Sequence, residues 1–243
     1  MTGKLENRIA LITGASSGIG AAIAEAFAAE GAQVVLAARR ADRLQTLADS
    51  ISTAERKALA CPTDVRREDE ILSVFETIDR KFGHLDILVN CAGFADHTPT
   101  ENLSLARWKD IVDTNLTACF LCSREALKRM KPRGSGRILI IGSISAKSPR
   151  PNSIGYTSTK FALEGMTRSL ALDARDFGVA VSILHPGSTK TELTPGMENR
   201  PPRDSMEARD VAAAATIMVS LPNETNLLEA VMLPIGQPFL GRG

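Results

Sequence analysis

The sequence lacks the marks of a membrane protein, a disordered chain and a nucleic-acid-binding protein. Aromatic residues make up 4% of the 243 residues, with one tryptophan and one tyrosine. The 29 Lys and Arg residues nearly balance the 28 Asp and Glu residues, so a broad electrostatic attraction for nucleic acid or anionic membranes is absent. No apolar run approaches the roughly 18 residues that a membrane span needs. The 44% hydrophobic content is nevertheless sufficient for a full core.

Cysteine and histidine are also scarce. The four cysteines are expected to be buried thiols, because a chain of this length and type does not need a disulfide framework. A zinc site at Cys119 and Cys122 would require two further ligands, and the three histidines show no ligand spacing. The N-terminal apolar stretch is too short for a signal peptide. We therefore predict a cytoplasmic protein that binds no metal.

Short apolar runs alternate with longer amphipathic stretches along the chain. The predicted strands are 9–12, 34–37, 58–60, 87–89, 138–141, 179–184 and 228–233. The predicted helices are 19–30, 41–52, 67–82, 105–130, 156–177 and 207–220. This alternation is typical of βαβ units. We predict an α/β fold, a Rossmann-type doubly wound parallel sheet of about seven strands with helices on both faces, in a single domain over 1–243.

Residues 187–206 differ from the rest of the chain. They contain few apolar residues, two glycines and three prolines, which indicates a loop. Loops of this length inside a compact domain are usually functional or disordered. Because it follows a predicted strand, the loop is expected to be a lid over a site at the carboxyl ends of the strands.

A glycine-rich turn follows the first predicted strand and opens the first predicted helix. It reads TGASSGIG at 13–20. Glycines let the backbone approach a pyrophosphate closely, and the helix N-terminus favours the phosphate charge. The alternative is a tight strand–helix turn without a ligand. The residues expected to bind the dinucleotide here are Gly14, Ser16, Ser17, Gly18, Ile19 and Gly20.

The end of the second predicted strand indicates which dinucleotide is bound. NAD sites usually place an acidic residue there to hold the ribose 2′-hydroxyl. This chain has Arg39 and Arg40 instead, and no carboxylate before Asp42. An arginine fork suits a 2′-phosphate, so we predict NADP(H), with Arg39 on the phosphate and Arg40 as a second contact. The alternative is a pair of arginines that face solvent.

A serine, the single tyrosine and a lysine form a candidate proton-transfer set. Ser143 follows a predicted strand, and Tyr156 and Lys160 lie at positions i and i+4, which share one helix face. A phenol is a weak base at neutral pH, and a nearby ammonium favours its ionised form. The Tyr–Lys spacing alone is common in helices. It indicates a catalytic pair only in combination with the glycine-rich turn and the serine.

Several segments together match one family in order. They are TGASSGIG at 13–20, Asp64-Val65, Asn90-Cys91-Ala92-Gly93, Asn115 within VDTNL, Ser143, Tyr156 with Lys160, and Pro186-Gly187 with Thr191. Over essentially its full length the chain resembles the short-chain dehydrogenase/reductase family, in its NADP-dependent branch. One departure is Cys91, which replaces the family's usual second asparagine at a position whose role is mainly in turn structure.

The resemblance implies roles for individual residues. Tyr156 would be the general acid or base, and Ser143 would orient the substrate oxygen. Lys160 would support Tyr156 and bind the nicotinamide ribose, and Asn115 would anchor a water that relays protons to Lys160. The further cofactor-binding residues that the resemblance implies are Asp64 and Val65 at the adenine, Pro186, Gly187 and Thr191 at the nicotinamide, and Asn90, Ala92, Gly93, Tyr156 and Lys160.

The implied activity is hydride transfer between NADP(H) and a small ketone, secondary alcohol or hydroxy acid. An alternative in the family is a 3-oxoacyl-thioester (acyl carrier protein) reductase. Such enzymes usually end in a glycine-rich strand, whereas residues 227–237 read LLEAVMLPIGQ. The alternative outside the class is a non-catalytic module that senses NADP(H), and the complete Ser-Tyr-Lys-Asn set argues against it.

The expected partners are a small carbonyl or alcohol substrate and further copies of the chain, with no nucleic acid and no membrane. The family is usually dimeric or tetrameric, so we expect a homotetramer or homodimer. The helices that begin near Leu105 and Tyr156 would meet across a two-fold axis, and the tail at 232–240 would add a second contact.

The wall of the substrate-binding site is expected to come from residues 94–97, 145–153 and 187–206. Lys147 there is either a surface charge or a carboxylate contact.

Overall fold

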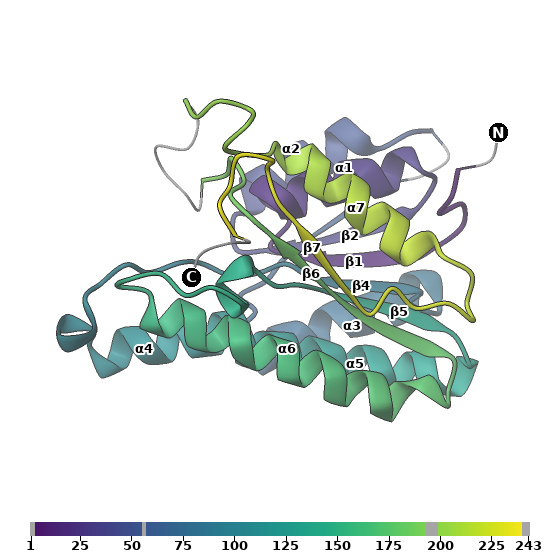
Figure 1. Cartoon of the computed structure of the whole chain (residues 1–243). Coiled ribbons are helices and arrows are strands. Elements are labelled where there is room, and N and C mark those ends of the chain that lie inside the picture. The colour runs from purple at the N-terminus through teal and green to yellow at the C-terminus, as the bar shows by residue number, and fades with distance from the viewer. Residues whose placement is uncertain (1–2, 55–56, 193–198, 240–243) are drawn as a thin grey trace.

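One parallel sheet organises the chain, which a computed structural model describes over residues 3–54, 57–192 and 199–239 (Figure 1). Its strands are β1 (Ile9–Thr13), β2 (Gln33–Ala38), β3 (Leu59–Pro62), β4 (Ile87–Asn90), β5 (Gly136–Ile141), β6 (Val179–Pro186) and β7 (Glu229–Met232). Every neighbouring pair is parallel, and the order is β3-β2-β1-β4-β5-β6-β7. The prediction of a doubly wound sheet of about seven strands is confirmed.

Helices cover both faces of this sheet. They are α1 (Gly18–Ala29), α2 (Ala41–Ile51), α3 (Glu68–Phe82), α4 (Leu105–Val112), α5 (Ala118–Arg133), α6 (Ile154–Arg175) and α7 (Ala208–Ser220). Figure 1 shows α1, α2 and α7 on one face and α3 to α6 on the other. Neighbouring strand residues therefore enter different cores: Ile12 packs on the α1 side and Leu11 on the α3 side. None of the described helices is long and apolar enough to cross a membrane.

The stretch predicted as one helix over 105–130 is interrupted. After α4, residues Asp113–Thr117 form a π-helical turn, and α5 continues from Ala118. A π-helical turn inserts an extra residue into the helix and changes which side chains face inward. Here it turns Asn115 into the protein, where the side chain is 2% exposed. The periodicity of the sequence could not show this turn, because its stabilising contacts come from distant residues.

The predicted loop at 187–206 lies between β6 and α7, with 193–198 outside the described residues. Its two described ends contact each other. The Lys190 N–H donates to the Met206 carbonyl at 2.9 Å, and the Met206 N–H donates to the Ser188 carbonyl at 2.9 Å. These bonds tie the beginning of the segment to its end, beside the carboxyl end of β6. Its role as a lid stays a prediction.

Asp86 links the amino ends of the two central strands. Its buried carboxylate accepts the Ile9 N–H of β1 at 2.8 Å and lies immediately before β4. The same carboxylate lies 3.1 Å from the His84 Nε2 and accepts a 3.3 Å hydrogen bond from Arg133 at the end of α5. A single side chain therefore fixes β1, β4 and α5 at the edge of the sheet away from the glycine-rich turn.

Replacing Asp86 by alanine should lower the free energy of unfolding by about 1–3 kcal/mol, because it leaves the buried Ile9 N–H unsatisfied. Urea denaturation checks this as a lower midpoint with an unchanged slope. Asp176→Ala is the matched control, since that carboxylate is exposed beside Arg175 and should change stability by less than about 0.5 kcal/mol. Equal effects of the two variants would contradict this account of Asp86.

Candidate active site at the carboxyl edge of the sheet

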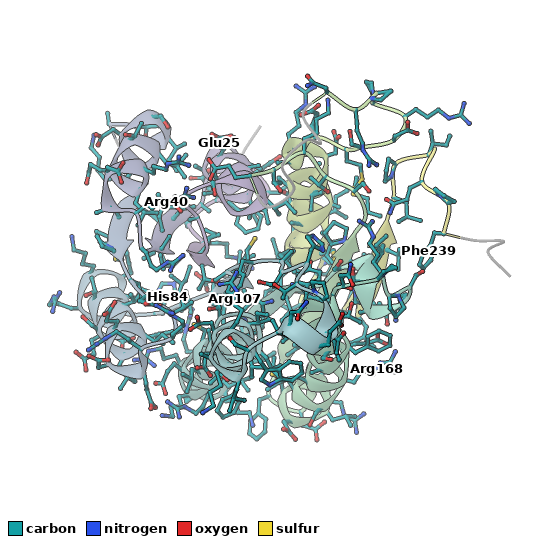
Figure 2. All side chains as sticks on the ribbon, turned by 90° about the vertical axis from the view of Figure 1, so that its left-hand side faces the viewer. Glu25, Arg40, His84, Arg107, Arg168 and Phe239 are labelled. Atoms are coloured by element: carbon teal, nitrogen blue, oxygen red, sulfur yellow. The ribbon has the colours of Figure 1, made fainter. Side chains whose placement is uncertain are left out.

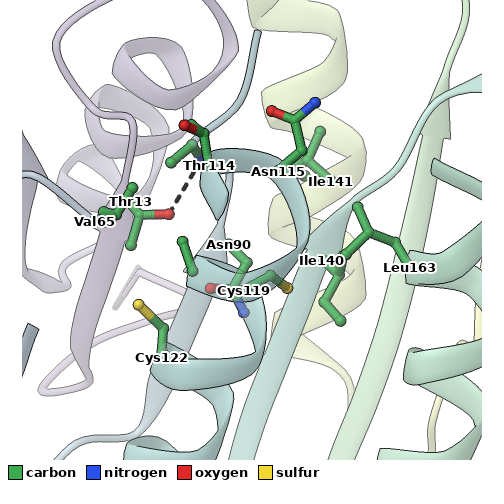
Figure 3. Close-up of a pocket in the computed structure, with 12 residues that line it drawn as sticks. Thr13, Val65, Asn90, Thr114, Asn115, Cys119, Cys122, Ile140, Ile141 and Leu163 are labelled. Atoms are coloured by element: carbon green, nitrogen blue, oxygen red, sulfur yellow. Dashed lines mark hydrogen bonds between the residues drawn. The ribbon is translucent and has the colours of Figure 1, made fainter. Parts of the chain in front are cut away.

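The Thr13 hydroxyl joins the carboxyl ends of β1 and β4, where the strand order reverses. It accepts the Cys91 N–H at 3.0 Å and the Ala92 N–H at 3.1 Å. Figure 3 shows Thr13 in a narrow pocket, together with Asn90 and Asn115. Ligands of open α/β sheets bind in the crevice at such a switch point. The strand ends therefore place several of the predicted site residues together.

The glycine-rich turn has room only for glycine at three positions. Gly14 and Gly18 have φ values of +69° and +55°, a region that disfavours other residues. A Cβ on Gly14 would lie 2.8 Å from the Ala92 Cα, and one on Gly20 would lie 2.4 Å from the Gly14 carbonyl oxygen. Ile19 packs against the core, and α1 begins at Gly18. This cradle at a helix N-terminus fits the pyrophosphate of a dinucleotide.

The two predicted phosphate arginines differ in surroundings. Arg40 lies against the turn: its guanidinium donates to the Ser16 Oγ at 3.0 and 3.1 Å and to the Ser17 Oγ at 2.6 Å. Arg39 is exposed. Figure 2 faces this edge of the sheet, with Arg40 on the side of α1 and α2 and Arg107 on the side of α4. Arg40 therefore contacts the glycine-rich turn directly, although the sequence predicted Arg39 as the main phosphate contact and Arg40 as the second.

Asp64 and Val65 lie beyond the end of β3. The Arg66 guanidinium hydrogen-bonds both oxygens of Asp64, at 3.0 and 2.6 Å, and holds the pKa of that carboxyl below its ordinary value. The Arg39 charge contributes further to this lowering, which places Arg39 near Asp64. Val65 is buried and lines the pocket beside Thr13. The predicted adenine side of the site thus holds the Asp64–Arg66 ion pair beside the buried Val65.

The segment after β4 is held in place by contacts with α5 and with Thr13. The Asn90 amide donates to the Ser123 Oγ of α5 at 3.0 Å, and both groups are buried. Ala92 is fixed by Thr13, and a Cβ on Gly93 would lie 3.2 Å from the Asn115 Oδ1. Burial raises the pKa of the Cys91 thiol to about 12, so this thiol stays protonated. The predicted structural role of the segment agrees with these contacts.

Asn115 acts as a clamp on the segment after β4. Its Oδ1 accepts the Phe94 N–H at 3.0 Å, and its Nδ2 donates to the Phe94 carbonyl at 3.0 Å. Nδ2 also donates to the Thr159 Oγ1 of α6 at 3.3 Å. The amide is thus engaged with the backbone of one loop and with the helix that carries Tyr156. The water relay expected at Asn115 stays a prediction.

Ser143 lies after β5 and is positioned by a histidine from β6. The His185 Nδ1 lies 2.9 Å from the Ser143 carbonyl oxygen and 3.3 Å from the Ser143 backbone nitrogen, and we assign the proton to Nδ1 because the contact with the carbonyl is the shorter one. The His185 ring is fully buried, and a Cβ on Gly142 would lie 2.6 Å from Nδ1. Burial lowers the pKa of His185, so the ring is neutral near pH 7. The Ser143 Oγ accepts the Ser145 N–H at 3.1 Å, which leaves its own proton for a substrate oxygen.

A charged cluster lies behind His185. The Lys147 ammonium bridges Glu164 of α6 at 2.7 Å and Glu229 of β7 at 2.5 Å. The His185 Nε2 lies 3.7 Å from Glu229 and has no hydrogen-bond partner within the described part of the chain. Glu164, His185 and Glu229 have the spacing of metal ligands, but the ammonium already serves as the cation there. Of the two interpretations of Lys147, an engaged surface charge fits this structure and a free carboxylate contact does not.

Tyr156 and Lys160 lie one turn apart on α6, as predicted. The Lys160 Nζ lies 5.4 Å from the centre of the Tyr156 ring and donates to the Ile141 carbonyl at 2.9 Å. Lys160 is 6% exposed, so its charge acts in a partly desolvated place. The bond to β5 fixes the ammonium beside the strand that leads into Ser143.

The segment after β6 returns to the glycine-rich turn. Pro186 ends β6, and the Gly187 N–H donates to the Met232 carbonyl of β7 at 2.7 Å. A Cβ on Gly18 would lie 3.2 Å from the Thr191 side chain. The predicted nicotinamide-side residues and the predicted phosphate turn are therefore adjacent, although they are far apart in the chain.

Sequence reasoning missed two features of the site. The spacing of the histidines excludes His185 as a metal ligand and assigns it no other role, although the residue directly precedes the Pro186-Gly187 segment. Sequence reasoning also made no use of Glu192, which accepts hydrogen bonds from Arg40 at 2.8 Å and from Arg43. The position of His185 beside that segment was a usable signal. The contact between Glu192 and α2 had no local signal, because it depends on how the segment after β6 crosses the sheet edge.

Known proteins share this arrangement. A family model described as short chain dehydrogenase matches residues 8–201. An oxidoreductase of Staphylococcus aureus (strain MRSA252) is 32% identical, with 95% of this chain and 99% of that protein covered. Two solved structures also superpose closely. An alcohol dehydrogenase of Thermococcus sibiricus complexed with 5-hydroxy-NADP has a TM-score of 0.89 at 27% identity, covering 96% of this chain and 99% of that one. A 3-ketoacyl-(acyl-carrier-protein) reductase of Brucella melitensis complexed with NADH has a TM-score of 0.86 at 30% identity, covering 96% and 98%.

Gly20→Ala should abolish dinucleotide binding, because its Cβ would force the Gly14 carbonyl out of the turn. Calorimetric titration with NADP⁺ measures the affinity of the variant for the dinucleotide. Gly165→Ala is the matched control, since Gly165 is exposed on α6 and its Cβ would meet nothing within 4 Å in the described chain. The control should bind normally and gain up to about 1 kcal/mol of stability. Normal binding by Gly20→Ala would show that this turn does not hold the phosphates.

Proposed function

The chain belongs to the short-chain dehydrogenase family, and we propose that it is an NADP(H)-dependent oxidoreductase acting on a small ketone, secondary alcohol or hydroxy acid. The observation that carries the proposal is the arrangement of Tyr156 and Lys160 on α6. Lys160 is buried and fixed to the strand that leads into Ser143. The glycine-rich turn at the end of β1 forms a cradle that fits a dinucleotide. NADP(H) is favoured over NAD(H) because the end of β2 is basic and lacks a carboxylate.

The cofactor would lie along the carboxyl edge of the sheet and would supply or accept the hydride. Gly14, Gly18 and Gly20 would admit its pyrophosphate, and Arg39 and Arg40 would bind the 2′-phosphate. At its adenine end, Asp64 and Val65 would form the wall. Asn90, Ala92 and Gly93 would border the site at its centre. The nicotinamide side would be held by Lys160, Pro186, Gly187 and Thr191.

Proton transfer is the chemistry of the protein's own residues. In the reductive direction the Tyr156 hydroxyl would donate its proton to the substrate oxygen, and in the oxidative direction it would take that proton back. The Lys160 ammonium would stabilise the phenolate that remains. Ser143 would donate a hydrogen bond to the same substrate oxygen and fix its orientation. Asn115 would hold the loop after β4 against α6.

A 3-oxoacyl-thioester reductase is the second candidate function. It is favoured by the likeness to the Brucella melitensis reductase, which covers 96% of this chain at 30% identity. The end of the chain argues for the leading candidate, because β7 runs into Leu233-Pro234 instead of a glycine-rich segment. Activity with acetoacetyl thioesters that exceeds activity with simple ketones would decide for the second candidate. Binding of NADPH without turnover of any carbonyl compound would favour the sensing module.

The expected cytoplasmic homo-oligomer is part of the proposal. Apolar side chains are exposed along the outer helices: Leu105 on α4, Phe120 on α5, and Phe161 and Leu172 on α6. Burial of these side chains between two copies would stabilise a dimer. Ile235 is exposed in the tail, where a second contact was expected over 232–240, and Leu240 lies outside the described residues.

Tyr156→Phe should lower kcat by about 100-fold or more, because general acid–base catalysis contributes about 10²–10⁴-fold. The fall in NADPH absorbance measures turnover, and calorimetry should show NADPH binding within about twofold of wild type. Ser158→Ala, an exposed change on the same helix, is the control and should keep full activity. Near wild-type turnover by Tyr156→Phe would remove Tyr156 from the mechanism.

Arg39→Ala and Arg40→Ala should each reduce the preference for NADPH over NADH by about tenfold or more, because a hydrogen bond to a charged group contributes about 1.5–3 kcal/mol. The ratio of kcat/KM values for the two cofactors measures the preference. Arg40→Ala also removes the hydrogen bonds to the Ser16 and Ser17 hydroxyls. The variant with the larger fall in the ratio identifies the arginine that contributes more to binding of the 2′-phosphate. An unchanged ratio in both variants would contradict the 2′-phosphate assignment.

His185 should act as a positioning residue for Ser143. Asparagine keeps a donor near the Nδ1 position and glutamine moves it toward Nε2, so His185→Asn should retain most of kcat and His185→Gln should lose about tenfold or more. Binding of NADPH should stay unchanged in both, as measured by calorimetry. Equal losses in the two variants would mean that His185 fills space without orienting Ser143.

A further inference from the structure

The Glu192 carboxylate connects the segment after β6 with the start of α2. One of its oxygens accepts a hydrogen bond from Arg40 at 2.8 Å, and the other accepts one from Arg43, a turn further along α2. Arg40 is at the same time held by the hydroxyls of Ser16 and Ser17 in the glycine-rich turn. The carboxylate therefore bridges two arginines, one of which is already part of the candidate cofactor site.

The path of the chain makes this bridge cross the cofactor site. Residues 187–192 begin at the carboxyl end of β6, on one side of the switch point between β1 and β4, and the two arginines lie on the other side. On the way, Thr191 lies close to Gly18, where a Cβ would approach its side chain to 3.2 Å. We call residues 187–192 the strap. Its last described residue is held where the adenosine end of the dinucleotide would lie.

We propose that Glu192 stands in for the 2′-phosphate of NADP(H), so that binding of the cofactor exchanges the carboxylate for the phosphate on Arg40 and Arg43. This proposal rests on the NADP(H) function proposed above. It assigns Arg43 to the phosphate site and makes Glu192 an internal competitor that sets the affinity for NADP(H).

The charges support an exchange of anions. Hydrogen bonds from Arg40 and then Arg43 lower the pKa of Glu192 to about 2, so the carboxylate is ionised throughout the working pH range. It carries one negative charge between two guanidinium groups. A phosphate monoester carries about 1.5 to 2 negative charges at pH 7 and has three strong acceptor oxygens. The 2′-phosphate is therefore the stronger partner for two arginines, whereas the neutral 2′-hydroxyl of NAD(H) is the weaker one.

The position of the ion pairs makes the exchange easy. The side chains of Arg40, Arg43 and Glu192 are all about half exposed. Ion pairs of this kind contribute little to stability, so Glu192 can be released without disturbing the fold. Displacing it still consumes part of the binding free energy of NADP(H). NAD(H) has no 2′-phosphate, so it would bind without displacing Glu192.

The test compares wild type with Glu192→Gln by calorimetric titration. The ligands are NADP⁺, NAD⁺, adenosine 2′-monophosphate and adenosine 5′-monophosphate. Glu192→Gln should tighten binding of NADP⁺ and adenosine 2′-monophosphate by about three- to tenfold, the range expected for losing two exposed ion pairs. The two ligands without a 2′-phosphate should bind as before. Glu25→Gln, which makes the same change of charge at an exposed position on α1, is the matched control and should leave all four affinities unchanged (Figure 2).

A second variant tests Arg43 itself. Arg43→Gln should weaken binding of adenosine 2′-monophosphate by about tenfold, because it removes one of the charged donors, and should leave adenosine 5′-monophosphate unaffected. Unchanged affinity for adenosine 2′-monophosphate in Glu192→Gln, or equal tightening of NADP⁺ and NAD⁺, would overturn the proposal. Wild type that binds NADP⁺ no more tightly than NAD⁺ would overturn the proposed cofactor instead. The two failures are thus distinguishable.

Discussion

The hydroxyl of Thr13 carries the constraint on which the arrangement of the site depends. It accepts two backbone N–H groups from the segment after β4, at the point where the strand order reverses. This contact brings the two loops so close that only glycine fits at position 14. The glycine-rich turn and the loop that contains Asn90 are therefore held as one unit. A dinucleotide that enters this crevice meets a surface formed before it arrives.

A second contact, between the ends of β5 and β6, holds the segment that contains Ser143 in place. β5 and β6 end side by side, and the ring of His185 packs against Gly142 while it donates to the Ser143 backbone. Lys160 reaches from α6 to the Ile141 carbonyl on β5. Ser143 and Lys160, two of the groups proposed to take part in proton transfer, are thus held against the sheet. Groups held in this way need little rearrangement when charge develops on the substrate oxygen.

Most charged side chains of the site lie at its rim, whereas its buried centre is mainly neutral. The centre of the site is formed by neutral hydroxyl and amide groups, with Lys160 as its buried cation. The larger charged clusters lie at its rim, with Lys147, Glu164 and Glu229 behind Ser143 and with Arg40, Arg43 and Glu192 across the nucleotide side. Water screens charges at the rim, so partners can be exchanged there. In the interior an unpaired charge would be costly, and the buried amides of Asn90 and Asn115 and the Lys160 ammonium each have a fixed partner.

The order of the elements, the doubly wound sheet and the residues that line the candidate site could be predicted from the sequence alone. Apolar runs mark strands that are buried on both faces, and the glycine-rich turn and the Tyr156–Lys160 pair are local patterns that a single helix or turn explains. The tertiary structure decided the rest. The π-helical turn at Asn115, the support of Ser143 by His185 and the contact of Glu192 with α2 join residues far apart in the chain. Such contacts leave no periodic signal, because their energy comes from the packing of one element against another and not from the preference of either element alone.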